Sequence, residues 1–76
     1  MIDVKRILEE ISHKKINKET DLVDDGILDS LGMIIFLSKL ENEGIEISFT
    51  RVNKDVLRHI DTLQKHIDEV VGGRNQ

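Results

Sequence analysis

Residues 27–44 read ILDSLGMIIFLSKLENEG and contain the longest apolar stretch of the chain, residues 33–37. The pair Asp29-Ser30 supplies polar residues typical of a helix start, and Gly44 suits the end of a helix. The apolar side chains between them recur at helical spacing. They are Leu31, Ile34 and Leu37 on one line, with Phe36 and Leu40 beside it. This stretch therefore predicts the central helix of the fold.

The chain before this helix predicts one more helix and a long loop. Asp3 can cap a helix whose apolar stripe is Val4, Ile7, Leu8 and Ile11, and the pattern fades at residues 13–15. Residues 16–29 show no period, and a connection of this length in a small domain is often functional. Its apolar residues should pin it to the helices, and Gly26 should mark a turn. The pinning residues are Ile16, Leu22, Val23, Ile27 and Leu28.

The chain after the central helix predicts a short helix followed by a long one. With no partner strand in the sequence, Ile45 and Ile47 are expected to be loop residues that reach the core. Asn53 can cap the short helix, which contains Val56, Leu57 and Ile60. Asp61 and Gln64 resemble a capping box that opens the last helix. The apolar face of that last helix is Leu63, Ile67, Val70 and Val71.

The predicted fold is a single all-α bundle of three main helices and one short helix, with a long loop between the first two helices. Seventy-six residues suffice for one domain, which we expect over residues 1–71, with a flexible tail over 72–76. The core should be built from the apolar faces of the three main helices. Its members are Leu31, Phe36, Leu37, Leu40, Ile7, Ile11, Leu63 and Ile67.

Composition narrows the classes of function. There is no cysteine, so any thiol chemistry must come from an added group. The formal net charge is −4 and Trp and Tyr are absent, which argues against nucleic acid and against a helix-turn-helix DNA binder. No apolar run is long enough to span a membrane, and no signal peptide is visible. We therefore expect a cytoplasmic monomer that does not insert into membranes.

Ser30 is the residue that draws attention as a chemical site. A serine at a helix start is most often only an N-cap. The same position also presents backbone N–H groups and the positive end of the helix dipole to a phosphate on the hydroxyl. Asp29 opposes a bare anion, but its carboxylate can help to hold a divalent cation that neutralises a pyrophosphate. Leu28 and Leu31 are expected to anchor the segment and to leave the hydroxyl outward.

The motif Asp29-Ser30-Leu31, placed at a helix start after a long loop, resembles the attachment motif of acyl and peptidyl carrier proteins. The resemblance covers residues 3–71 and includes residues 21–26, 37–41, 44–47 and 60–63. It implies that a phosphopantetheinyl transferase moves 4′-phosphopantetheine from coenzyme A onto Ser30. The arm then holds an acyl or aminoacyl cargo as a thioester, between a loading ligase and a downstream acyltransferase or synthase. The protein itself is then not an enzyme.

The subgroup stays open between two similar kinds of carrier. Residues 26–32 are similar to D-alanyl carriers, whereas residues 52–63 are similar to free-standing polyketide or nonribosomal-peptide carriers. Fatty-acid carriers usually show acids on the exposed face of this helix, where this chain has Gly32 and Ile35. An apolar docking patch of Met33 and Ile35 is one hypothesis, and packing of Ile35 onto the loop is the other. The acids Asp24 and Asp25 are expected to steer basic partners.

Other site chemistries find less support. The three histidines are not paired at metal-ligand spacing, so no metal site is predicted. Asp21, Asp24 and Asp25 lack the spacing of a calcium loop. No nucleophile–base–acid set is visible, so no catalytic residue is assigned. The alternative to a carrier is a helical protein-interaction module with the same fold and no prosthetic group.

Overall fold

A computed structural model of the chain describes residues 2–49 and 52–74. Four helices follow one another: α1 (Val4–Ser12), α2 (Ser30–Asn42), α3 (Lys54–Arg58) and α4 (Ile60–Arg74). The described ranges contain no strand. The all-α prediction, with three longer helices, one short helix and a long connection after the first, is confirmed.

Helix α1 begins and ends where its sequence predicts. The Asp3 carboxylate caps it by accepting a hydrogen bond from the Arg6 backbone N–H at 3.1 Å. The helix stops at Ser12 because His13 takes a left-handed conformation, with φ of 59°. Its buried residues are Val4 and Leu8, while Ile7 and Ile11 are half-buried against the core. The predicted stripe therefore faces the core, but its centre lies on Val4 and Leu8.

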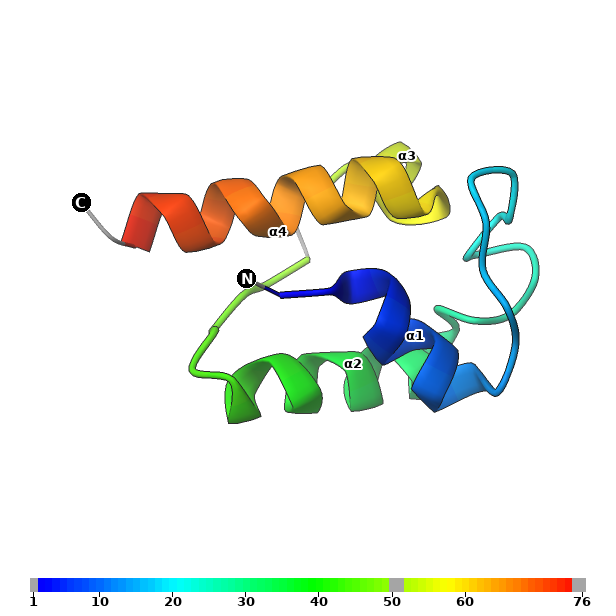
Figure 1. Cartoon of the computed structure of the whole chain (residues 1–76), viewed down its shortest axis with the longest axis horizontal. Helices are drawn as coiled ribbons and strands as arrows, with labels where there is room; N and C mark the ends of the chain where they lie inside the picture. Colours follow the sequence, from blue (N-terminus) through cyan, green and yellow to red (C-terminus); the bar gives the residue numbers. More distant parts are fainter. Residues whose placement is uncertain (1, 50–51, 75–76) are drawn as a thin grey trace.

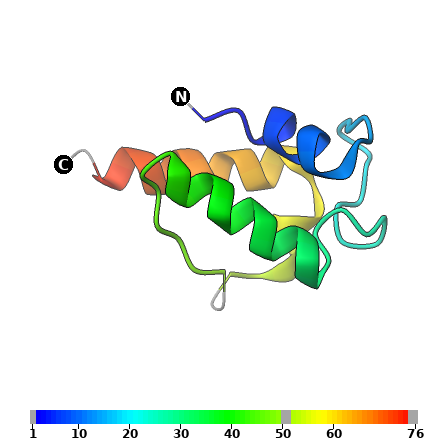
Figure 2. The ribbon, with the colours of Figure 1, turned by 90° about the horizontal axis from the view of Figure 1, so that it is seen from below.

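The helices pack so that α1 contacts both long helices. Helix α1 lies against α2 and α4, and α3 packs on the start of α4 (Figure 1). Viewed from below, α2 runs alongside the other helices, and its first turn lies at the end of the molecule away from the C-terminus (Figure 2). The start of α2 therefore sits beside the long α1–α2 loop.

The α1–α2 loop is held in place by its own apolar side chains. The buried ones are Ile16, Leu22, Ile27 and Leu28, and Val23 is half-buried. Backbone hydrogen bonds fix the loop as well: Leu22 N–H donates to the Arg58 carbonyl at 2.6 Å, and Leu28 N–H donates to the Leu22 carbonyl at 2.8 Å. Gly26 makes a turn with φ of 75°. The prediction that these residues pin the loop is confirmed.

Of the eight residues predicted for the core, four are fully buried, three are half-buried and one is exposed. Phe36, Leu40, Leu63 and Ile67 are fully buried, and Leu37 is half-buried. Leu31 is 65% exposed, so it does not anchor α2. The buried line of α2 is instead Gly32, Phe36 and Leu40, spaced four residues apart.

The connection between α2 and α3 reaches into the core, as expected. Gly44 follows the C-cap residue Glu43 in a left-handed conformation, with φ of 81°, and turns the chain back. Ile45 is then buried at 4% exposure, and Ile47 is half-buried. Phe49 stacks on the ring of Phe36 with the centroids 6.1 Å apart. Residues 44–49 therefore close the core without forming a helix or a strand.

The start of α4 differs from its prediction. Asn53 caps α3 as expected, by accepting a hydrogen bond from Asp55 N–H at 2.9 Å. Helix α4 begins at Ile60. Its first turn is joined to α3 by the Thr62 hydroxyl, which donates a hydrogen bond to the Val56 carbonyl at 2.8 Å. Asp61 and Gln64 do not form a capping box, because Gln64 is used elsewhere.

Gln64 joins the start of the chain to α4. Its side-chain amide donates to the Ile2 carbonyl at 2.8 Å and accepts from Val4 N–H at 2.9 Å. It thereby satisfies two backbone groups ahead of and inside the first turn of α1.

Helix α4 continues to Arg74, into the range 72–76 for which a flexible tail was predicted, and Asn75 and Gln76 lie outside the described residues. Among the described residues, no helix is both long enough and apolar enough to cross a membrane.

Candidate functional site around Ser30

Asp29, and not Ser30, caps helix α2. The Asp29 backbone is extended, and its Oδ1 accepts a hydrogen bond from Gly32 N–H at 2.7 Å. Its carbonyl accepts from Met33 N–H at 2.8 Å. Ser30 is the first helical residue and is exposed. Within the described part of the chain its hydroxyl makes no hydrogen bond. The capping role that a serine usually plays at a helix start is therefore already filled.

Gly32 lets α2 lie directly on the loop. It is buried, and a methyl group added at its Cα would collide with the backbone carbonyl oxygen of Ile27. The same methyl would lie 3.2 Å from Asp29 Oδ1. The resemblance to fatty-acid carriers predicted that Gly32 lies on the exposed face of α2, whereas in the structure Gly32 is buried. Close packing of Gly32 on a buried loop residue fixes the position of Ser30 two residues earlier.

Three residues share the outer face at the start of α2. A helix advances by about 100° per residue, so Ser30 and Ile34 lie opposite the buried line that runs through Gly32. Leu31 lies on the same outer side. Leu31 and Ile34 are 65% and 63% exposed, and they are the large apolar side chains most open to solvent among the described residues. An apolar pair therefore flanks the Ser30 hydroxyl.

Met33 and Ile35 do not form a joint patch. Two residues apart on a helix, they lie on opposite flanks of α2. Met33 is half-buried and packs against the core. Ile35 is half-buried and faces a cavity at the loop, together with Gly26 and Ile27. Ile35 therefore lies beside the loop, whereas Leu31 and Ile34 are the exposed apolar side chains of α2, and the docking role predicted for Met33 and Ile35 stays a prediction.

The two loop acids lie in different surroundings. Asp24 is 70% exposed and pairs with the Arg58 guanidinium at 3.3 Å. Asp25 is exposed, and its backbone carbonyl accepts a hydrogen bond from Lys14 Nζ at 3.3 Å. No described side chain pairs with the Asp25 carboxylate. The Asp25 carboxylate therefore has no ion-pair partner among the described residues, whereas the charge of Asp24 is partly offset by Arg58.

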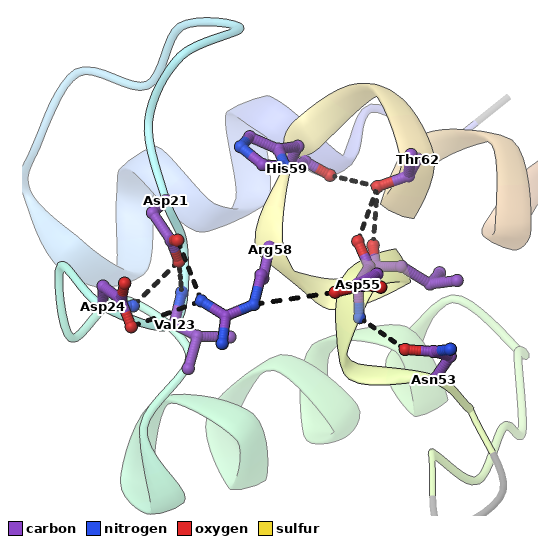
Figure 3. Close-up of polar contacts among 9 residues, drawn as sticks. Asp21, Val23, Asp24, Asn53, Asp55, Arg58, His59 and Thr62 are labelled. Carbon is purple, nitrogen blue, oxygen red and sulfur yellow. Dashed lines mark hydrogen bonds and ion pairs between the residues drawn. The ribbon is translucent and has the colours of Figure 1, made fainter.

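Arg58 is a structural residue that the sequence did not reveal. Its guanidinium contacts Asp21 at 2.9 Å, Asp24 at 3.3 Å and Asp55 at 3.9 Å, and it thereby joins α3 to the α1–α2 loop (Figure 3). Thirty-seven residues separate Arg58 from Asp21, and no short motif links them. The one hint in the sequence is that residues 19–29 contain five acids and no lysine or arginine, so a cation from elsewhere in the chain is needed to offset their charge.

Asp21 is held in its ionised form by several donors. Its Oδ1 accepts from the backbone N–H groups of Asp24 at 2.9 Å and Val23 at 3.0 Å. Hydrogen bonding from Asp24 N–H, followed by Arg58, holds the pKa of Asp21 below its ordinary value, although partial loss of hydration opposes this shift. The paired carboxylates raise the pKa of Arg58 above its ordinary value. Asp21 therefore shapes the loop through its contacts with the loop backbone and with Arg58.

No described group of three or more His, Asp or Glu side chains is arranged to hold a metal ion. In comparisons with known proteins, no family model, no curated sequence and no solved structure matches the chain. The resemblance to carrier proteins therefore stands on the residues of this sequence alone.

Proposed function

We propose that this protein is a carrier that bears 4′-phosphopantetheine on Ser30. The observation that carries the proposal is the state of the Ser30 hydroxyl, which is exposed and free of hydrogen bonds to the described residues. Because Asp29 caps the helix, the hydroxyl is not needed for folding. The resemblance of Asp29-Ser30-Leu31 to a carrier attachment motif supplies the chemical identity of the group.

The surroundings of Ser30 suit a phosphodiester. Ser30 is at the positive end of the dipole of a thirteen-residue helix. The Asp29 carboxylate accepts the Gly32 N–H, so part of its charge is already engaged. Its second oxygen makes no hydrogen bond or ion pair with the described residues and can help a transferase to hold a divalent cation near the incoming pyrophosphate.

In the loading step, Ser30 Oγ forms a bond to the phosphorus that bears the pantetheine arm in coenzyme A. The bond from that phosphorus to the bridging oxygen breaks, and adenosine 3′,5′-bisphosphate leaves with the electron pair. The hydroxyl proton passes to a base of the transferase, since no described residue contacts this hydroxyl. The attached group supplies a thiol, which this cysteine-free chain lacks, and that thiol carries the cargo.

Partner enzymes would dock on the outer face around Ser30, because the arm must enter their active sites. Leu31 and Ile34 offer apolar contact there, and Asp25 offers charge. The partners expected are a transferase, a ligase that loads an acyl or aminoacyl group, and an acyltransferase or synthase that removes it. The same exposed apolar pair favours the second candidate function, a protein-interaction module without a prosthetic group.

Intact mass separates the two candidates. The protein is incubated with coenzyme A and a broad-specificity phosphopantetheinyl transferase, and a gain of one phosphopantetheinyl group is expected. Ser30→Ala should abolish this gain. Ser38→Ala, a change of another exposed serine on α2, should leave it intact. If the wild-type chain gains no mass, the interaction module is the remaining candidate function. If the Ser30→Ala chain still gains the group, Ser30 is not the attachment site.

A further inference from the structure

The cavity that Ile35 faces lies beside the start of α2 and has a volume of about 210 Å³. It is open to solvent and is formed by the end of α1, the turn of the loop and the first turns of α2. Its apolar wall includes Ile11, Ile27, Leu31 and Ile35, and Lys14 stands at its polar side. Asp29, Leu31 and Gly32 also line it, so it begins one residue from Ser30.

Lys14 is the cation of this cavity. Its ammonium group donates to the backbone carbonyl of Asp25 at 3.3 Å, which draws the side chain toward the loop. No carboxylate of the described residues forms an ion pair with it. Its positive charge is therefore not offset by an ion pair within the described residues, and it can attract an anion near the start of α2.

We infer that this cavity receives the part of the arm nearest to Ser30. The inference rests on the proposed function. A phosphodiester at Ser30 would be attracted by Lys14, and the dimethyl-substituted carbon that follows the phosphate in pantetheine would contact Ile11 and Ile35. The cavity is smaller than the roughly 300–1,000 Å³ that encloses a whole drug-sized ligand. It therefore holds only the part of the arm nearest to Ser30, here called the root of the arm, and leaves the thiol end outside.

The size and openness of the cavity make this contact weak and reversible. An apolar group that meets a half-open wall gains only part of its burial free energy, and an exposed ion pair adds little. The arm can therefore leave the cavity when a partner binds. While it rests there, the root of the arm has a preferred direction, toward α1 and away from α3.

Filtered nuclear Overhauser spectra test this inference on carbon-13-labelled protein that carries an unlabelled arm. We expect cross-peaks between the arm methyl protons and the methyl groups of Ile11 and Ile35. The amides of Gly26 and Ile27 should shift between the unloaded and the loaded protein. Lys14→Gln should reduce these shift changes. The matched change Lys15→Gln, at an exposed lysine outside the cavity wall, should leave them as in wild type.

The outcomes separate this inference from the proposed function. A chain that gains the arm by mass but shows no cross-peaks to Ile11 or Ile35 overturns the cavity contact alone. Cross-peaks to α3, for example to Val56, would do the same and place the arm on the other side of α2. A chain that never gains the arm overturns both.

Discussion

The Asp29 carboxylate accepts a hydrogen bond from the Gly32 backbone N–H at 2.7 Å, so Asp29 caps α2 and Ser30 does not. The two neighbouring polar residues therefore have separate roles: one stabilises the helix and the other is available for chemistry. Substitution at the two positions should separate these roles.

Asp29→Ala should lower the free energy of unfolding by about 1 kcal/mol, because the Gly32 N–H loses its acceptor. Ser30→Ala should change it by less than about 0.5 kcal/mol, because an exposed hydroxyl without a partner contributes little. Asp29→Asn, which keeps a capping oxygen, is the control and should stay near wild type. Urea unfolding followed by circular dichroism measures all three. A larger loss for Ser30→Ala than for Asp29→Ala would contradict the assignment of the cap.

Gly32→Ala and Gly72→Ala should have opposite effects on stability. The first puts a methyl group against the Ile27 carbonyl, and overpacking of this kind costs about 1–3 kcal/mol. The second adds a methyl group in open space on α4 and should stabilise the helix by roughly 0.5–1 kcal/mol. Thermal melting of the two variants beside wild type tests this. If Gly32→Ala raises the melting temperature as much as Gly72→Ala does, the loop moves easily to make room for the added methyl group.

Stability should fall in acid partly through Asp21. Its pKa in the folded state is below the value of about 3.9 that an aspartate has in an unfolded chain. Its contribution is therefore fully present above about pH 4 and is lost as the pH falls through the folded value. Asp21→Asn should be less stable near neutral pH and should show a flatter decline in acid.

Urea midpoints from about pH 6 down to about pH 3 measure this dependence. Asp55→Asn is the control, because Asp55 is 85% exposed and lies 3.9 Å from Arg58. It should follow the wild-type curve. An Asp21→Asn curve parallel to wild type would assign the acid sensitivity to other groups.

Docking kinetics should distinguish the apolar and the charged parts of the face around Ser30. Ile34→Glu should speed dissociation from the transferase at both low and high salt, because an exposed apolar contact is lost. Asp25→Asn should slow association mainly at low salt, whereas Asp24→Asn should have less effect because Arg58 already offsets Asp24.

Ser38→Glu is the control for Ile34→Glu, since it adds the same charge one turn further along α2. Dissociation rates from surface-bound transferase supply the measurement. If Ile34→Glu and Ser38→Glu dissociate alike, the docking surface does not include Ile34.

The sequence predicted the helices well because their ends carry clear signals. Asp3 and Asn53 cap the helices they precede, and Gly26 and Gly44 turn the chain with positive φ. The buried face of α2 was predicted less well. From Leu31 to Leu37 the helix is apolar on nearly every side, so periodicity alone did not identify which line faces the core.

The remaining errors concern contacts between distant parts of the chain. Gly32 is buried because the Ile27 carbonyl lies against it, and Gln64 binds the N-terminal backbone and not its own helix start. Arg58 meets Asp21 only after α3 has packed at the loop. Local propensity contains no information on such pairs, because tertiary packing creates them.

The link between Gln64 and the backbone at Ile2 and Val4 bears on the order in which the chain acquires its structure during synthesis. The ribosome makes α1 before the other helices, yet two of the groups at its start find their partner 60 and 62 residues later. Translation at about 5–20 residues per second means that α1 must wait several seconds for this partner. The first helix to be made is therefore held in its final place only once α4 has emerged.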